Sequence, residues 1–146
     1  MFMDERNEFS DGQTCANAAS TVLSTNVIDS SVARDLGNGQ PVYLVIQIDT
    51  TVTSDGAALI QFRLRSDAAA AIHATTSTAH VDTGAIPKAT LVAGYTQVIP
   101  LPMGTTYERY IGVQHIVSAA TTTAGTYSAF LTLDPTGWTA YADATN

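Results

Sequence analysis

Hydrophobic and polar residues alternate along two neighbouring stretches of the chain, residues 42–49 and 57–65. A period of two is typical of a β-strand with one buried face. The residues expected to face the core are Val42, Leu44, Ile46, Ile48, Ala58, Ile60, Phe62 and Leu64. The dipeptide Asp55-Gly56 between the stretches is a common hairpin turn. The pattern therefore predicts a β-hairpin over both stretches.

The same reading predicts further strands at residues 20–32, 95–101, 108–118 and 125–134, with the loop SAATTTAG as a second hairpin connection. Residues 66–83 are ambiguous and suggest a short turn or helical piece followed by a strand. The segment DLGNGQ predicts a tight turn with Gly37 and Gly39 at positive φ, and Pro41 suits the start of a strand. We expect an all-β fold, an antiparallel β-sandwich or jelly roll. It forms a single domain over 1–146, with an N-terminal arm (1–17) and a C-terminal tail (135–146).

Charge changes this picture by excluding classes of partner. Only 13% of residues are charged, and the formal net charge is −7. The chain has no basic stripe of the kind that binds nucleic acid and no basic cluster for an anionic membrane. It also has no apolar run of about 18–20 residues and no hydrophobic signal core at the N-terminus. We therefore expect no nucleic-acid or membrane partner, and a protein made in the cytoplasm.

Candidate chemistry is sparse. The three histidines, His73, His80 and His115, lack metal-binding spacing, so hydrogen-bonded or surface roles are the better interpretation. Cys15 is the one cysteine, and acids upstream favour a passive thiol. Three carboxylates near predicted strand ends could in principle pair as in a glycosidase, although turn formation explains them better; they are Asp49, Asp82 and Asp134. We expect no catalytic residue, no metal and no cofactor.

Candidate contact residues fall into two groups. Arg63 and Arg65 lie on the predicted outward face of a strand, where they could meet an acidic partner surface or be solvated edge charges. Four aromatic residues lie in terminal segments without a strand pattern and could anchor a neighbouring subunit. They are Phe2, Phe9, Trp138 and Tyr141.

Several segments, in order, resemble the small capsid cement (decoration) proteins of tailed bacteriophages. They are MDERNEFSDGQ, STNVID, ARDLGNGQPVYLVIQIDT, LIQFRLRSD, TGAIPKATLVAGYTQVIPLP, RYIGVQ and AGTYSAFLTLD, which together span most of residues 3–134. The resemblance implies a jelly-roll protein on the outer capsid surface of the virion, assembled as a homodimer or homotrimer. It implies a major capsid protein of HK97-like fold as partner, and neither catalytic residues nor a cofactor.

Two alternatives stay open at this point. A carbohydrate-binding β-sandwich module of a phage fibre or surface protein would need exposed aromatic and acidic side chains at one sheet face or loop end. An enzyme of the cupin or glycosidase type would need a bound metal or a facing carboxylate pair.

Overall fold

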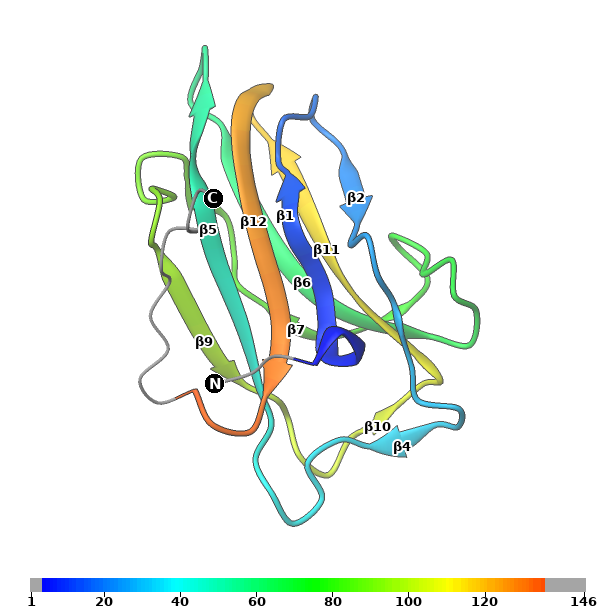
Figure 1. The fold of residues 1–146 in the computed structure, drawn as a ribbon. Coiled ribbons are helices and arrows are strands. Elements are labelled where there is room, and N and C mark those ends of the chain that lie inside the picture. The colour runs from blue at the N-terminus through cyan, green and yellow to red at the C-terminus, as the bar shows by residue number, and fades with distance from the viewer. Residues whose placement is uncertain (1–3, 136–146) are drawn as a thin grey trace.

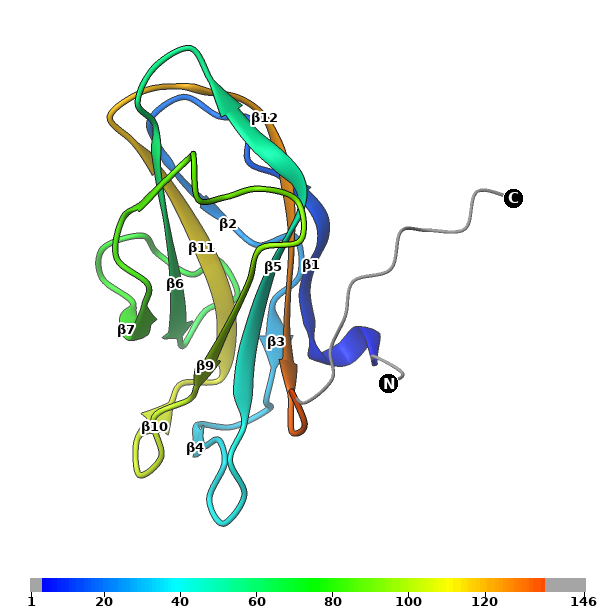
Figure 2. The same cartoon turned by 90° about the vertical axis from the view of Figure 1, so that its left-hand side faces the viewer.

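The computed structural model describes residues 4–135, which fold into two antiparallel sheets packed face to face (Figures 1 and 2). The described part contains one 3₁₀ turn and twelve strands. Their bounds are η1 Glu5–Asn7, β1 Glu8–Thr14, β2 Thr21–Leu23, β3 Ile28–Asp29, β4 Arg34–Asp35, β5 Tyr43–Ser54, β6 Leu59–Asp67, β7 Thr78–Asp82, β8 Ile86–Pro87, β9 Thr96–Pro100, β10 Thr106–Tyr107, β11 Tyr110–Ser118 and β12 Thr122–Thr132.

The strand order is that of a jelly roll. The front sheet of Figure 1 runs β1-β12-β5-β9, and the back sheet runs β2-β11-β6-β7, with β3 also paired to β11 and β8 to β6. The short strands β4 and β10 pair with each other at one end of the sandwich. Strands β5 and β6 lie in different sheets, and so do β11 and β12, whereas β6 and β7 are neighbours in the back sheet. This arrangement confirms the predicted fold class.

Both predicted hairpins are wrong for the same reason. Strand β5 pairs with β12 and β9, whereas β6 pairs with β11, β7 and β8. The Asp55-Gly56 turn therefore carries the chain from the front sheet to the back sheet, and residues 119–121 carry it back. The two crossings touch, because a Cβ on Gly56 would lie 2.7 Å from Cβ of Ala120. Alternation predicts which face is buried, but it does not predict the strand's neighbour.

The predicted faces are correct along the central strands. Leu44, Ile46 and Ile48 of β5 point into the sandwich, and so do Ile60 and Phe62 of β6. They meet the inward residues of β11 and β12, where the Phe62 and Tyr127 rings lie edge to face at 5.0 Å. The buried core consists of Phe9, Cys15, Leu44, Ile46, Ile48, Val52, Ile60, Phe62, Leu64, Val81, Leu91, Leu101, Tyr107, Ile111, Val113, Val117, Tyr127 and Ala129.

The strand predicted over residues 20–32 is interrupted. Strands β2 and β3 both pair with β11, but the chain between them leaves the back sheet. There the Asn26 N–H donates to the carbonyl of Phe9 on β1 at 2.8 Å. The Ser24 hydroxyl donates to the Asn26 carbonyl and accepts from the Val113 N–H, so it fixes the bend. This segment closes the side of the sandwich where β1 and β2 are edge strands.

The remaining predictions on local structure agree with the fold. Residues 68–77 form a loop and β7 follows, as expected for the ambiguous segment. Gly37 and Gly39 both have φ of 89° in the turn before β5. A Cβ at Gly37 would also lie 2.9 Å from the Gln40 carbonyl oxygen, so both the positive φ and the lack of space require glycine at this position.

Candidate interaction surface

The structure places the predicted contact residues in very different surroundings. Phe9 lies on β1 with no exposed surface and packs in the core. The prediction that it anchors a partner is therefore corrected: residues 8–14 add an edge strand to the front sheet, paired with β12, and bury this ring. Phe2, Trp138 and Tyr141 lie outside the described residues.

Arg65 is also corrected. It does sit on the outward face of β6, but only 6% of its surface is exposed. The loop 68–77 folds over this face, and the carbonyl and hydroxyl of Ser77 accept from the Arg65 guanidinium at 2.9 and 3.1 Å. The loop also brings Ile72 over Gly112 of β11, where a Cβ would approach Ile72 Cδ1 to 2.8 Å. A strand pattern gives no sign that a later loop will cover the strand.

Arg63 stays at the surface, although it is engaged within the chain. Its Nε lies 2.8 Å from Oδ2 of Asp82 on the neighbouring strand β7, and Gln61 donates to the other carboxylate oxygen. Burial alone would raise the pKa of Asp82, but the hydrogen bonds from Gln61, Gly84 and Arg63 lower it. An exposed pair of this kind contributes little stability. It leaves Arg63 available to a partner only in competition with Asp82.

The candidate chemical residues occupy structural positions. Asp49 and Asp82 lie on outward faces of opposite sheets, so they do not face each other. Cys15 is fully buried, and burial followed by the charge of Asp49 raises the pKa of its thiol to about 12. His80 bonds the Ser66 hydroxyl at 2.7 Å and stacks on Tyr107. Within residues 4–135, no three His, Cys, Asp or Glu side chains gather as metal ligands.

His115 belongs to a polar chain inside the sandwich. Its Nδ1 lies 3.2 Å from the Tyr127 hydroxyl, which donates to Oε1 of Gln13, and its Nε2 lies 3.0 Å from Nδ2 of Asn17. Because the Tyr127 proton goes to Gln13, the hydroxyl accepts from Nδ1–H, and Nε2 accepts from the Asn17 amide. Burial lowers the pKa of His115 to about 4, so the ring is neutral. This series of hydrogen-bonded side chains links the back sheet to the front sheet.

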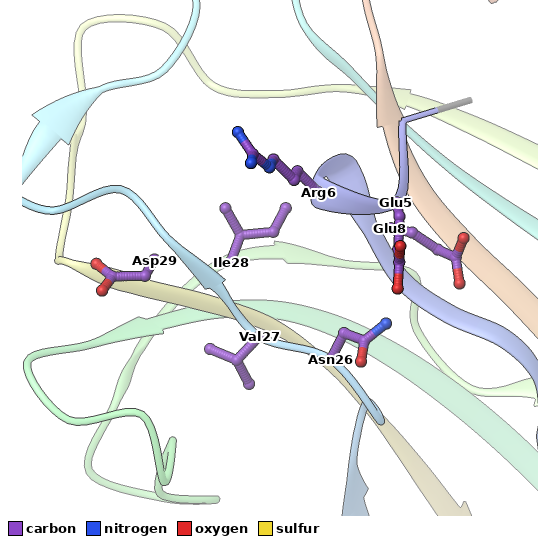
Figure 3. Close-up of a pocket in the computed structure, with 7 residues that line it drawn as sticks. All are labelled: Glu5, Arg6, Glu8, Asn26, Val27, Ile28 and Asp29. Carbon is purple, nitrogen blue, oxygen red and sulfur yellow. The ribbon is translucent and has the colours of Figure 1, made fainter. Parts of the chain in front are cut away.

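A groove of about 370 Å³ opens on the side of the sandwich between η1, the start of β1 and β3 (Figure 3). The backbone bond from Asn26 to Phe9 joins its two walls, and Ile28 at its centre packs against the core. Asp4 caps η1 by accepting from the Arg6 N–H at 3.0 Å, and this bond stabilises the wall of the groove that η1 forms. The lining residues are Glu5, Arg6, Glu8, Asn26, Val27, Ile28 and Asp29.

The charges of the groove are unevenly paired. Asp29 accepts two hydrogen bonds of 2.8 Å from Arg109, whose guanidinium lies over the Tyr110 ring, and the Arg109 bonds are the largest cause that lowers the pKa of Asp29 to about 2. Glu5 and Glu8 carry no hydrogen bond or ion pair from a side chain of residues 4–135. Burial, then the charges of Asp11 and Glu5, raise the pKa of Glu8. Among the described residues, no cation therefore pairs with the negative charge at this end of the groove.

The sequence patterns did not predict this groove. Its walls come from segments about twenty residues apart, and neither carries a motif. The one available signal was the acidic lead-in MDERNEFSD, which the strand patterns left without a role. These acidic residues line a groove only because residues 24–27 turn toward β1, and alternation does not encode that turn.

The sequence was compared with known protein families. A family model described as Bbp16 matches residues 9–131, which run from β1 to β12. No curated protein matches the sequence. No helix among residues 4–135 has the length and apolar character needed to cross a membrane.

Proposed function

The chain belongs to the Bbp16 family, and we propose that it is a capsid cement protein of a tailed bacteriophage. In this proposal it binds the outside of the icosahedral head as a homo-oligomer and contacts a major capsid protein of HK97-like fold. It has no catalytic role, and it is made in the host cytoplasm before it joins the virion.

The observation that carries the proposal is the ordered resemblance to cement proteins. The segments that carry it form the central strands of both sheets: YLVIQIDT begins β5, LIQFRLRSD is β6, YIGVQ begins β11, and AGTYSAFLT ends β12. The same stretch of chain lies within the Bbp16 match. The resemblance therefore follows the whole jelly roll and is not confined to one short motif.

The described surface also suits a contact protein. Several large apolar side chains are exposed on loops and on the edge strand β9, where apolar contact area favours association. They are Val32, Val92, Val98, Met103 and Leu133, with exposed fractions from 42% to 60%.

The proposed mechanism is thermodynamic linkage. A protein that binds the expanded lattice and not the unexpanded one lowers the free energy of the expanded state. Each contact needs only an ordinary interface, about 800 Å² per partner. An oligomer that touches several shell subunits gains avidity, because each later contact is intramolecular.

The test is binding to purified empty heads of the parent phage in the two lattice states. The full-length protein should cosediment with expanded heads, leave unexpanded heads largely unbound, and raise the temperature at which expanded heads break apart. Equal binding to both states, or binding without stabilisation, would contradict the cement role.

A further inference from the structure

The groove between η1 and β3 is the described surface whose chemistry most closely defines a ligand. We propose that it binds an extended, basic segment of the shell protein, with a lysine or arginine side chain laid across Ile28 and its charged head between Glu5 and Glu8. The identity of the partner rests on the proposed function, whereas the chemistry of the groove does not.

The geometry matches such a side chain in its apolar part. Ile28 occupies the centre of the groove and is held in place by the core beneath it (Figure 3). Lysine and arginine carry a long aliphatic stem that covers apolar surface while the head reaches a polar rim. A wholly acidic or wholly polar ligand would leave Ile28 uncovered.

The charges determine the sign of the ligand. The Asp29 carboxylate is already neutralised by Arg109, so it does not attract a further cation strongly. Glu5 and Glu8 carry like charges near each other, and Asp11 adds to the repulsion. Bringing a cation between them relieves this repulsion, which is a favourable term that an anionic or neutral ligand does not supply.

Arg6, the groove's own cation, leaves this position open. In Figure 3 its side chain extends away from Glu5 and Glu8 and lies above Ile28. It therefore lines the opposite part of the groove, where it can pair with a carboxylate or a backbone carbonyl of the same incoming segment. Charges of both signs along the groove would fix the register of the bound segment.

The first experiment uses the free full-length chain and a synthetic peptide. A short peptide with one lysine between leucines is titrated while the amide resonances are followed by NMR, and a matched peptide carries norleucine in place of lysine. We expect shifts in residues 5–8 and 26–29 with the lysine peptide, with a dissociation constant of about 1 mM. The double variant Glu5→Gln, Glu8→Gln should lose them. An absence of shifts in these residues, or equal shifts with norleucine, would overturn the inference.

The second experiment measures affinity for purified expanded heads. Glu5→Gln with Glu8→Gln should weaken binding roughly tenfold and flatten its salt dependence. The control Asp55→Asn with Glu108→Gln removes the same charge elsewhere and should bind as wild type does. Arg6→Gln should weaken binding by no more than a few fold, because it removes a contact with the incoming segment while making the groove more acidic.

The two experiments separate the two proposals. If wild type binds the lysine peptide but not expanded heads, the cement role fails and the groove chemistry stands. If wild type binds heads and the Glu5, Glu8 variant binds them equally well, the groove is not the contact, and the inference is overturned while the cement role stands.

Discussion

Polar groups are hydrogen-bonded to one another in the interior of the sandwich, whereas the Glu5 and Glu8 carboxylates of the groove on its side accept from no described side chain. Inside, His115, Tyr127, Gln13 and Asn17 form a continuous hydrogen-bonded chain between the sheets. In the groove, Glu5 and Glu8 face a hollow with no cation from a described residue between them. Buried polar groups must be paired within the fold because water cannot replace the partner. Stability therefore depends on the interior, whereas we assign recognition of a partner to the groove on the side.

The largest loss of stability is expected when a core aromatic side chain near the groove is removed. Phe9→Ala deletes a fully buried aromatic side chain and should lower the free energy of unfolding by about 3–5 kcal/mol. Urea denaturation measures the loss, and Phe9→Leu provides a milder variant if the first does not fold. Val98→Ala, at a side chain that is 42% exposed, should change stability by about 0.5 kcal/mol or less. Equal effects at both positions would place Phe9 outside the core.

The interior network predicts a loss of stability in mild acid. The pKa of His115 is about 4 in the folded chain against an ordinary value of 6.5, so between these values the unfolded chain binds a proton that the folded chain does not. Stability present above pH 6.5 is therefore lost as the pH falls toward 4, by up to about 3 kcal/mol. Chemical denaturation at a series of pH values measures this slope. His115→Gln should remove this component of the slope and His73→Gln should keep it; an unchanged slope in His115→Gln would assign the effect to another group.

The outward face of the back sheet, which the loop 68–77 covers, predicts a loss of stability of intermediate size. Gly112→Ala places a Cβ 2.8 Å from Ile72 and 3.0 Å from Leu23, so one of them must move. We expect a loss of about 1–3 kcal/mol in thermal unfolding and faster proteolysis within the loop 68–77. Adding Ile72→Val should restore part of the loss, because the Cδ1 atom in conflict is gone. No recovery would mean that the loop does not rest on Gly112.

The groove predicts the smallest change in stability. Glu5→Gln with Glu8→Gln removes repulsion at the surface, so the free energy of unfolding should stay the same or rise by about 0.5 kcal/mol. The same variant should weaken binding to expanded heads, which separates recognition from folding. A large loss of stability would show that these carboxylates belong to the structural framework.

The sequence predicted what local periodicity can carry. It assigned the buried and outward faces of β5 and β6 correctly, and the turn at Gly37, because these depend on neighbours within a few residues. It failed at Asp55-Gly56 because the choice between a hairpin and a crossing depends on which strands occupy the edges of β5. It placed Arg65 on the outward face of β6 but did not predict that a loop covers it, since residues 68–77 have no period that reveals their position.

The contact surface was the least predictable part. Aromatic residues near the N-terminus suggested Phe9, but an edge strand at residues 8–14 turns that ring into the core and leaves Glu8 on the other side of β1. The acidic residues gained a possible role only when residues 24–27 were seen to turn toward β1. Both outcomes depend on contacts between segments distant in sequence, which neither composition nor alternation contains.

A cryo-EM map of expanded heads decorated with the full-length protein tests the central claim most directly. We expect the side bearing η1 and β3 to face the shell, with density for a basic side chain of the major capsid protein against Ile28 and between Glu5 and Glu8. A map in which the protein is bound and this groove faces solvent would contradict it.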